Sequence, residues 1–128
     1  MKTIVYQGIE GSFSHLTAKR LYGTSCRLLG LPTFREAFEA VEKGEADCAL
    51  LPIENTLAGT IYETLDLLSQ GHLKVIGVVN TRIEHSLLGL PGTPISEIRK
   101  SFLPACFQSE VERNQLLPFL PLQRPRGK

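Results

Sequence analysis

The sequence predicts an α/β fold in which helices cover a mainly parallel sheet, giving three layers. Two observations support this prediction. Apolar stretches of strand length alternate with amphipathic stretches of helix length up to about Leu90, and glycines follow the points where such helices would end. The composition agrees, because 42% of the 128 residues are hydrophobic and 21% are charged, which is enough for a packed core.

The first predicted elements are a strand over residues 2–7, a helix that follows Ser14 and ends at Gly23, and a short strand over residues 27–31. The next helix is the best marked. Thr33 and Glu36 have the spacing of a capping box, in which each residue's side chain accepts from the other's backbone amide. Its apolar face repeats at helical spacing and ends before Gly44. That face comprises Phe34, Ala37, Phe38 and Val41.

The second half of the predicted fold begins with a buried strand over residues 47–53, an apolar run bounded by charge and proline. A loop over residues 54–59 leads into a helix over residues 60–70, which has Ile61, Leu65 and Leu68 on one face. Residues 73–79 are expected to form another strand, and residues 83–90 a further strand or its continuation.

Charge and composition exclude several function classes. A net charge of +1 without a basic block argues against a nucleic-acid or anionic membrane partner, and no apolar run reaches the roughly 20 residues of a membrane helix. The N-terminal residues are too short and polar for a signal peptide, so we expect a cytoplasmic protein. Three widely spaced cysteines (Cys26, Cys48 and Cys106) indicate neither a disulfide framework nor a metal site. We expect no metal and no cofactor.

The loop from Gly8 to Ser14 is suited to binding an anion. Gly8 and Gly11 let the backbone approach a ligand closely, although they do not form a dinucleotide fingerprint. Ser12 and Ser14 place hydroxyls beside the unpaired amides and positive dipole of a helix N-terminus. The plain structural alternative is that these serines only cap the helix.

A second loop, residues 52–60, has similar chemistry just before another predicted helix. It offers the amide of Asn55, the hydroxyl of Thr56 and the flexible backbone of Gly59. Asn55 could equally form an Asx-turn. Three residues could act as acid or base, but isolated charged groups are more often solvated or structural. These are His15, Glu54 and Asp66. The residues alone therefore predict an α/β domain that binds a small anionic metabolite.

Several ordered motifs resemble the prephenate dehydratase family, over about residues 4–99. Gly8 to His15 resembles that family's Gly-Pro-Glu-Gly-Thr-Phe-Ser-His signature, and residues 47–56 resemble its Pro-Ile-Glu-Asn-Ser block. The Phe-x-x-Val-Glu-x-Gly ending of residues 38–44 and the His-Ser-Leu-Leu of residues 85–88 also resemble family motifs.

The resemblance implies a fold like the type II periplasmic binding proteins, with two α/β lobes around a cleft. Residues 1–78 would form the first lobe and residues 79–100 the start of the second. The implied reaction is decarboxylative dehydration of the dicarboxylate prephenate to phenylpyruvate in phenylalanine biosynthesis, without a cofactor. Carried over by position, the substrate-binding residues would be Ser12, Ser14, Asn55, Thr56 and Gly59, with Gly8, Gly11 and Glu54 supporting the loops.

Three departures from the family pattern affect the expected activity. Ile9 replaces a proline and Thr56 a serine, and both changes are mild. The family's catalytic Thr-Arg-Phe motif has no counterpart; Thr81-Arg82-Ile83 is a look-alike at the wrong place in the order of motifs. Catalytic residues are therefore left unassigned, weak turnover is expected, and a regulatory ACT domain is not expected. Arogenate dehydration and non-catalytic carboxylate binding stay open as alternatives, and the resemblance implies a homo-oligomer.

The last part of the chain, residues 101–128, departs from the family and is rich in proline. Pro118, Pro121 and Pro125 disfavour a regular helix or a central strand. We expect this tail to be irregular and the second lobe to be unfinished, as a frame change in the gene or an artificial truncation would produce.

Overall fold

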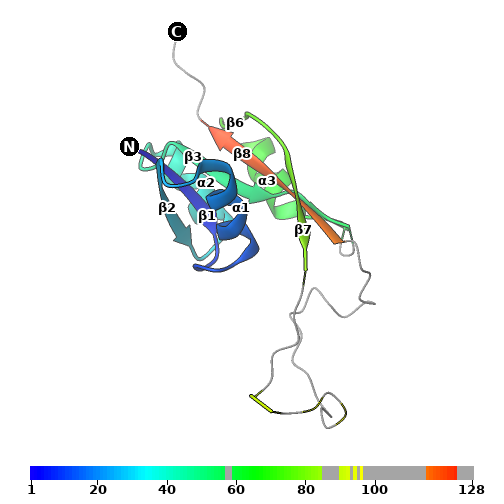
Figure 1. Cartoon of the computed structure of the whole chain (residues 1–128). Helices are drawn as coiled ribbons and strands as arrows, with labels where there is room; N and C mark the ends of the chain where they lie inside the picture. Colours follow the sequence, from blue (N-terminus) through cyan, green and yellow to red (C-terminus); the bar gives the residue numbers. More distant parts are fainter. Residues whose placement is uncertain (57–58, 85–89, 93, 95, 97–114, 124–128) are drawn as a thin grey trace.

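The structure is a computed structural model that describes residues 1–56, 59–84, 90–92, 94, 96 and 115–123 (Figure 1). Residues 85–88, which carry the predicted His-Ser-Leu-Leu motif, and Cys106 lie outside the described residues. Within the description the helices are α1 (Phe13–Tyr22), α2 (Phe34–Glu42) and α3 (Tyr62–Gln70). The strands are β1 (Lys2–Gln7), β2 (Cys26–Leu31), β3 (Cys48–Pro52), β4 (Glu54–Asn55), β5 (Gly59–Thr60), β6 (Lys74–Val75), β7 (Val79–Ile83) and β8 (Gln115–Gln123).

The central sheet has the order β2-β1-β3-β8-β6, and β7 also pairs with β8. Strand β1 runs parallel to both β2 and β3, as the sequence predicts for strands joined through helices. Strand β8 runs antiparallel to β3, β6 and β7. The two short strands β4 and β5 form a separate antiparallel hairpin.

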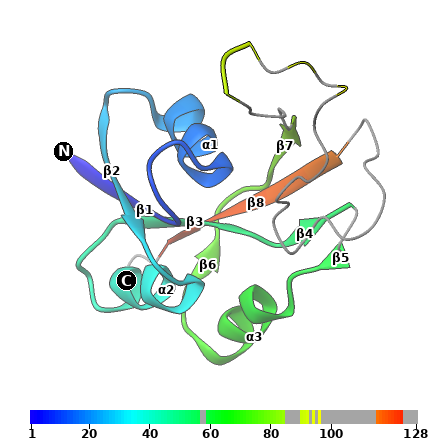
Figure 2. The ribbon, with the colours of Figure 1, turned by 90° about the horizontal axis from the view of Figure 1, so that it is seen from below.

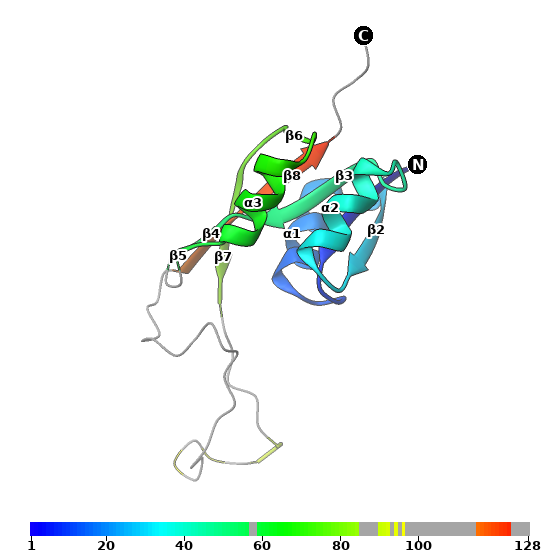
Figure 3. The same cartoon turned by 180° about the vertical axis from the view of Figure 1, so that it is seen from behind.

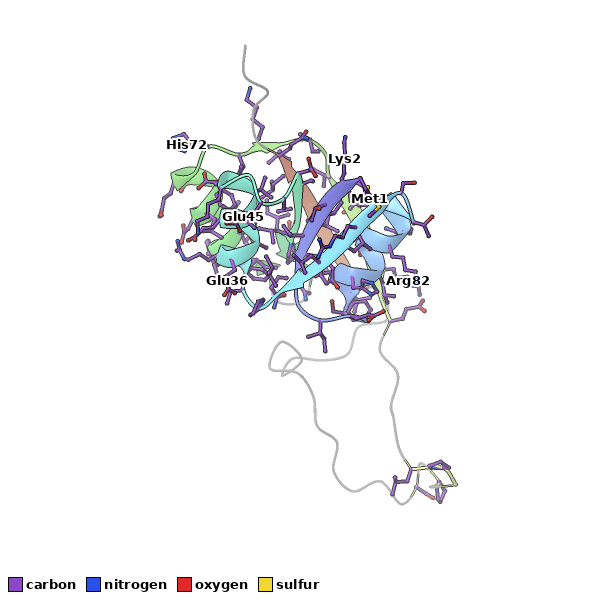
Figure 4. All side chains as sticks on the ribbon, turned by 90° about the vertical axis from the view of Figure 1, so that its left-hand side faces the viewer. Met1, Lys2, Glu36, Glu45, His72 and Arg82 are labelled. Carbon is purple, nitrogen blue, oxygen red and sulfur yellow. The ribbon has the colours of Figure 1, made fainter. Side chains whose placement is uncertain are left out.

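Helices cover both faces of this sheet, which confirms the predicted layers (Figures 2 and 4). On one face α1 packs through Ala18 against Tyr6 and Leu50. On the other face α2 and α3 pack against the opposite side chains of the same strands. The larger cluster there includes Val5, Ala37, Phe38, Val41, Ala49, Leu51, Leu67, Leu73 and Leu122. Each large apolar side chain buried in this way contributes about 1.5–3 kcal/mol to folding.

Helix α2 forms as predicted, for reasons that are local. The Thr33 hydroxyl accepts from the Glu36 amide at 3.1 Å, and the Glu36 carboxylate accepts from the Thr33 amide at 3.0 Å. Three of the four predicted face residues are buried, and Phe34 is half-buried. The capping box and the apolar face of this helix are therefore confirmed.

The expectation that residues 101–128 are irregular is wrong for residues 115–123, which form the strand β8. Proline removes a backbone donor, but its φ is compatible with a strand, so pairing on both sides can hold such a segment extended. Pro118 lies opposite Asn80 of β7, whereas Pro121 lies opposite Leu50 of β3. Because Pro118 lies in the β7–β8 pairing and Pro121 in the β3–β8 pairing, each of these two pairings lacks at most one backbone N–H donor.

Two smaller expectations in the second half also need correction. The segment 54–59 is expected as a loop, but Glu54 and Asn55 pair with Thr60 and Gly59 in the β4–β5 hairpin. In α3 the buried residues are Thr64 and Leu67, while Leu65, expected on the buried face, is 36% exposed. The Thr64 hydroxyl donates to the Pro52 carbonyl at 2.7 Å, and this contact turns the polar residue toward the sheet.

Candidate functional site

The two predicted anion-binding loops follow β1 and β3, which are neighbouring parallel strands. The carboxyl ends of parallel strands meet at one edge of a sheet, where ligands of open α/β folds bind. Figure 3 shows the loop before α1 and the β4–β5 hairpin at this same end of the sheet. The fold thus brings both loops to one edge, as the sequence predicts.

The first loop is held by backbone bonds that require glycine. The Gly8 amide donates to the Leu31 carbonyl of β2 at 2.8 Å, with Gly8 at a φ of 111° and Gly11 at 87°. Only glycine adopts such angles without strain. A third glycine, Gly30 of β2, leaves room for the loop, because a Cβ there would overlap the Gly8 carbonyl oxygen.

His15 organises this loop from within α1. Its Nδ1 accepts from the Gly11 amide at 2.9 Å, which requires that nitrogen to be unprotonated. Its ring lies against Tyr6, with centroids 5.5 Å apart. Burial raises the pKa of the Tyr6 phenol, and the nearby Glu10 carboxylate raises it further, so Tyr6 stays neutral. These contacts give His15 a structural role, because it holds the loop through Gly11 and packs on Tyr6.

The two serines of the first loop have different environments. Ser12 is the N-cap of α1 and its hydroxyl accepts from the His15 amide at 3.3 Å, which is the plain capping role. Ser14 lies in the first turn and is only 7% exposed. Its hydroxyl makes no hydrogen bond within the described part of the chain.

The oxygen of Ser14 must still reach solvent. No fully buried side-chain oxygen or nitrogen among the described residues lacks a hydrogen-bond partner, and the Ser14 hydroxyl has none. It therefore stands at the surface of an otherwise buried residue, at the positive end of the α1 dipole. A hydroxyl donor next to a positive helix end is suited to a carboxylate.

The second loop presents its residues on the β4–β5 hairpin. Asn55 is 8% exposed, Gly59 opposite it is half-buried with a φ of 80°, and Thr56 and Glu54 are exposed. The hairpin is fixed at its base, because the Ile61 amide donates to the Ile53 carbonyl at 2.8 Å. Asn55 and Thr56 both have further contacts in the structure.

The Thr-Arg-Ile look-alike lies on β7 and its polar groups are engaged. Thr81 is 8% exposed and bonds to Thr17 of α1, with 2.9 Å between the hydroxyl oxygens. Arg82 is exposed, and its Nε lies 3.2 Å from a Glu84 carboxylate oxygen (Figure 4).

Sequence reasoning missed the polar cluster of Thr17, Arg20 and Thr81 between α1 and β7. Arg20 donates from Nη2 to the Thr81 hydroxyl and to the Asn80 carbonyl, each at 3.2 Å. The available signal was weak: a threonine near the middle of a helix, whose partner is 64 residues away.

No group of three or more potential metal ligands lies together among the residues with a described placement. Asp66 is exposed on α3. None of the helices in the described segments is long and apolar enough to cross a membrane.

The family model for prephenate dehydratase matches residues 4–104. The "arogenate dehydratase/prephenate dehydratase 6, chloroplastic" of Arabidopsis thaliana is 40% identical over 100 residues, covering 78% of this chain and 23% of that protein. This chain therefore spans less than a quarter of that relative's length. The relative is chloroplastic, and a cytoplasmic location for this chain stays a prediction.

Solved structures show the same fold. The prephenate dehydratase of Streptococcus mutans matches with a TM-score of 0.66 and 23% identity over 98% of this chain and 50% of that one. A prephenate dehydratase from Arthrobacter aurescens in complex with L-Phe matches with a TM-score of 0.78 and 18% identity, over 98% and 61% of the two chains. This likeness confirms the predicted fold class, similar to the type II periplasmic binding proteins.

Proposed function

The chain belongs to the prephenate dehydratase family, and from this premise we propose that it binds prephenate or arogenate at the edge formed by the Gly8–Ser14 loop and the β4–β5 hairpin. The observation that carries the proposal is Ser14. Its hydroxyl is unpartnered within the described residues, on a side chain otherwise buried at the N-terminus of a ten-residue helix.

The chemistry of the reaction fits these groups. Loss of CO₂ and of the ring hydroxyl produces an aromatic ring, so the driving force lies in the substrate. The protein has to orient the carboxylates and assist departure of the hydroxyl as water. The Ser14 hydroxyl, at the positive end of the α1 dipole, would bind one carboxylate, and Asn55 would contribute an amide from the hairpin.

We further propose that this chain binds substrate more effectively than it turns substrate over. For the Thr-Arg-Phe motif that the family resemblance associates with catalysis, this sequence offers only the look-alike Thr81-Arg82-Ile83, at the wrong place in the order of motifs. In support, the Thr81 hydroxyl is occupied by Thr17 and Arg20, and Arg82 lies beside Glu84. Self-association also stays a proposal.

Calorimetric titration of the 128-residue chain with prephenate, and separately with arogenate, tests the binding proposal. Ser14→Ala should raise Kd about tenfold or more, because a hydrogen bond to a charged group contributes about 1.5–3 kcal/mol. Adding Asn55→Ala should weaken binding further. Ser69→Ala, which removes an exposed hydroxyl on α3, is the matched control and should leave Kd unchanged.

Two results would contradict the proposal. Wild-type affinity in the Ser14→Ala, Asn55→Ala double variant would show that the ligand binds elsewhere. Formation of phenylpyruvate from prephenate at about 1 per second or faster, within the usual range of enzyme kcat values, would contradict weak turnover. Tighter binding of one of the two ligands identifies the preferred substrate.

A further inference from the structure

A continuous chain of hydrogen bonds links helix α1 to strand β7 and returns to the first turn of α1. Arg20 Nη2 lies 3.2 Å from the Thr81 hydroxyl, and that hydroxyl lies 2.9 Å from the hydroxyl of Thr17. The Thr17 hydroxyl donates in turn to the Phe13 carbonyl at 2.7 Å. Phe13 is the first residue of α1 and lies between Ser12 and Ser14. The chain of bonds therefore ends at the candidate site.

Hydrogen-bond donation along this chain of bonds can run in only one direction, from Arg20 to the Phe13 carbonyl. A carbonyl oxygen can only accept, so the one proton of the Thr17 hydroxyl is used toward Phe13. The Thr17 oxygen can then only accept from Thr81, and the Thr81 oxygen accepts from Arg20, whose guanidinium has donors alone. Each of the two threonine hydroxyls therefore donates to one partner and accepts from one.

Burial makes these contacts costly to lose. Thr17 is 1% exposed and Thr81 is 8% exposed, so a hydroxyl left unpaired there would lack water as a substitute. Arg20 also donates to the Asn80 carbonyl, so it holds two successive residues of β7. The bond from Thr17 back to a carbonyl four residues earlier is of the kind that bends helices, so it bears on the tilt of the first turn.

We propose that Arg20, Thr81 and Thr17 are positioning residues that set the first turn of α1, and with it Ser14, relative to β7. The inference rests on the proposed function, because it names what holds that same site in place. It requires that removing a link on β7 changes the site although no residue of the site has been touched. Replacing Arg20 should likewise weaken binding only when the Thr81 hydroxyl is present to link Arg20 to Thr17.

The test compares Thr81→Val, which removes the hydroxyl at similar volume, with Arg20→Met, their double variant and the conservative Thr81→Ser. Lys19→Met is the matched control, since it removes a neighbouring exposed cation from the same turn of α1. The readouts are the backbone amide resonances of residues 11–15 without ligand, and Kd for prephenate by calorimetry.

Thr81→Val should shift the resonances of residues 11–15 and weaken binding about fivefold, and Arg20→Met about threefold. The double variant should bind like Thr81→Val alone, Thr81→Ser should restore binding, and Lys19→Met should match the wild type. Wild-type resonances and affinity in Thr81→Val, or multiplication of the two single effects in the double variant, would overturn the inference.

The failure of this inference is distinguishable from failure of the proposed function. If the wild-type chain does not bind prephenate, the proposed function is wrong and the amide resonances alone decide whether β7 sets the first turn. If Thr81→Val does not fold, Arg20→Met, which removes the donor to the Thr81 hydroxyl, is tested with the same two readouts. Arg20 is exposed, so its replacement by methionine leaves the apolar core intact.

Discussion

Replacing Leu122 by alanine tests the insertion of the proline-containing strand β8 into the core. Leu122 is 0% exposed and packs in the cluster formed by α2, α3 and the central strands. Removing its three outer carbons loses about 2.4 kcal/mol at ~0.8 kcal/mol per buried methylene. The remaining cavity adds to this, as leucine-to-alanine changes in cores generally cost about 2–5 kcal/mol. We expect a loss of about 3 kcal/mol.

Urea unfolding followed by circular dichroism measures this loss, and thermal unfolding should show a fall in Tm of about 10 °C. Leu90→Ala is the control, because that side chain is 81% exposed and its truncation should change stability by less than about 0.5 kcal/mol. A loss below about 1 kcal/mol in Leu122→Ala would refute the reasoning, since it would mean that β8 does not complete the core.

Three further predictions concern other parts of the fold. Gly30→Ala should destabilise the protein by about 1–3 kcal/mol, because the new Cβ overlaps the Gly8 carbonyl oxygen; an unchanged Tm would contradict this. Thr33→Ala should cost about 1 kcal/mol in urea unfolding through loss of the α2 cap, whereas Thr33→Ser should not. Burial raises the pKa of the Cys48 thiol above 9.0 and, with added effects of Cys48, that of the Tyr22 phenol above 10.0. The folded state then holds these protons more tightly, so the free energy of unfolding should fall as pH rises above about 9. Tyr22→Phe should reduce the fall above pH 10, and a urea midpoint that is constant from pH 8 to 10.5 would contradict the assignment.

Local signals explain which elements the sequence could predict. Helix α2 has its cap, its apolar face and its closing glycine within a dozen residues, and all three agree. Strand β8 has no such signal, because Pro118 and Pro121 argue against a strand and only pairing with β3 and β7 holds it extended. The buried face of α3 could not be predicted in this way, because Thr64 bonds to Pro52, a contact that spacing within the helix cannot reveal.

The candidate site could likewise be predicted only in part from the sequence. The glycines and serines of the first loop are contiguous, so the sequence could predict that Gly8, Gly11 and Ser14 act together at a helix start. It could not separate Ser12, which caps the helix, from Ser14, which has no partner within the described residues. Nor could it find the link to Thr81, which depends on how α1 packs on β7.

The central place of β8 has a consequence for the order of folding. Among the described strands β8 comes last along the chain, yet it lies between β3 and β6, with Leu50 opposite Pro121. Until those late residues have been synthesised, β3 has an open edge beside an incomplete core. Pairing over such sequence separation folds slowly and exposes the intermediate to aggregation. Closure of the sheet by β8 is therefore expected to limit the folding rate and the soluble yield during synthesis.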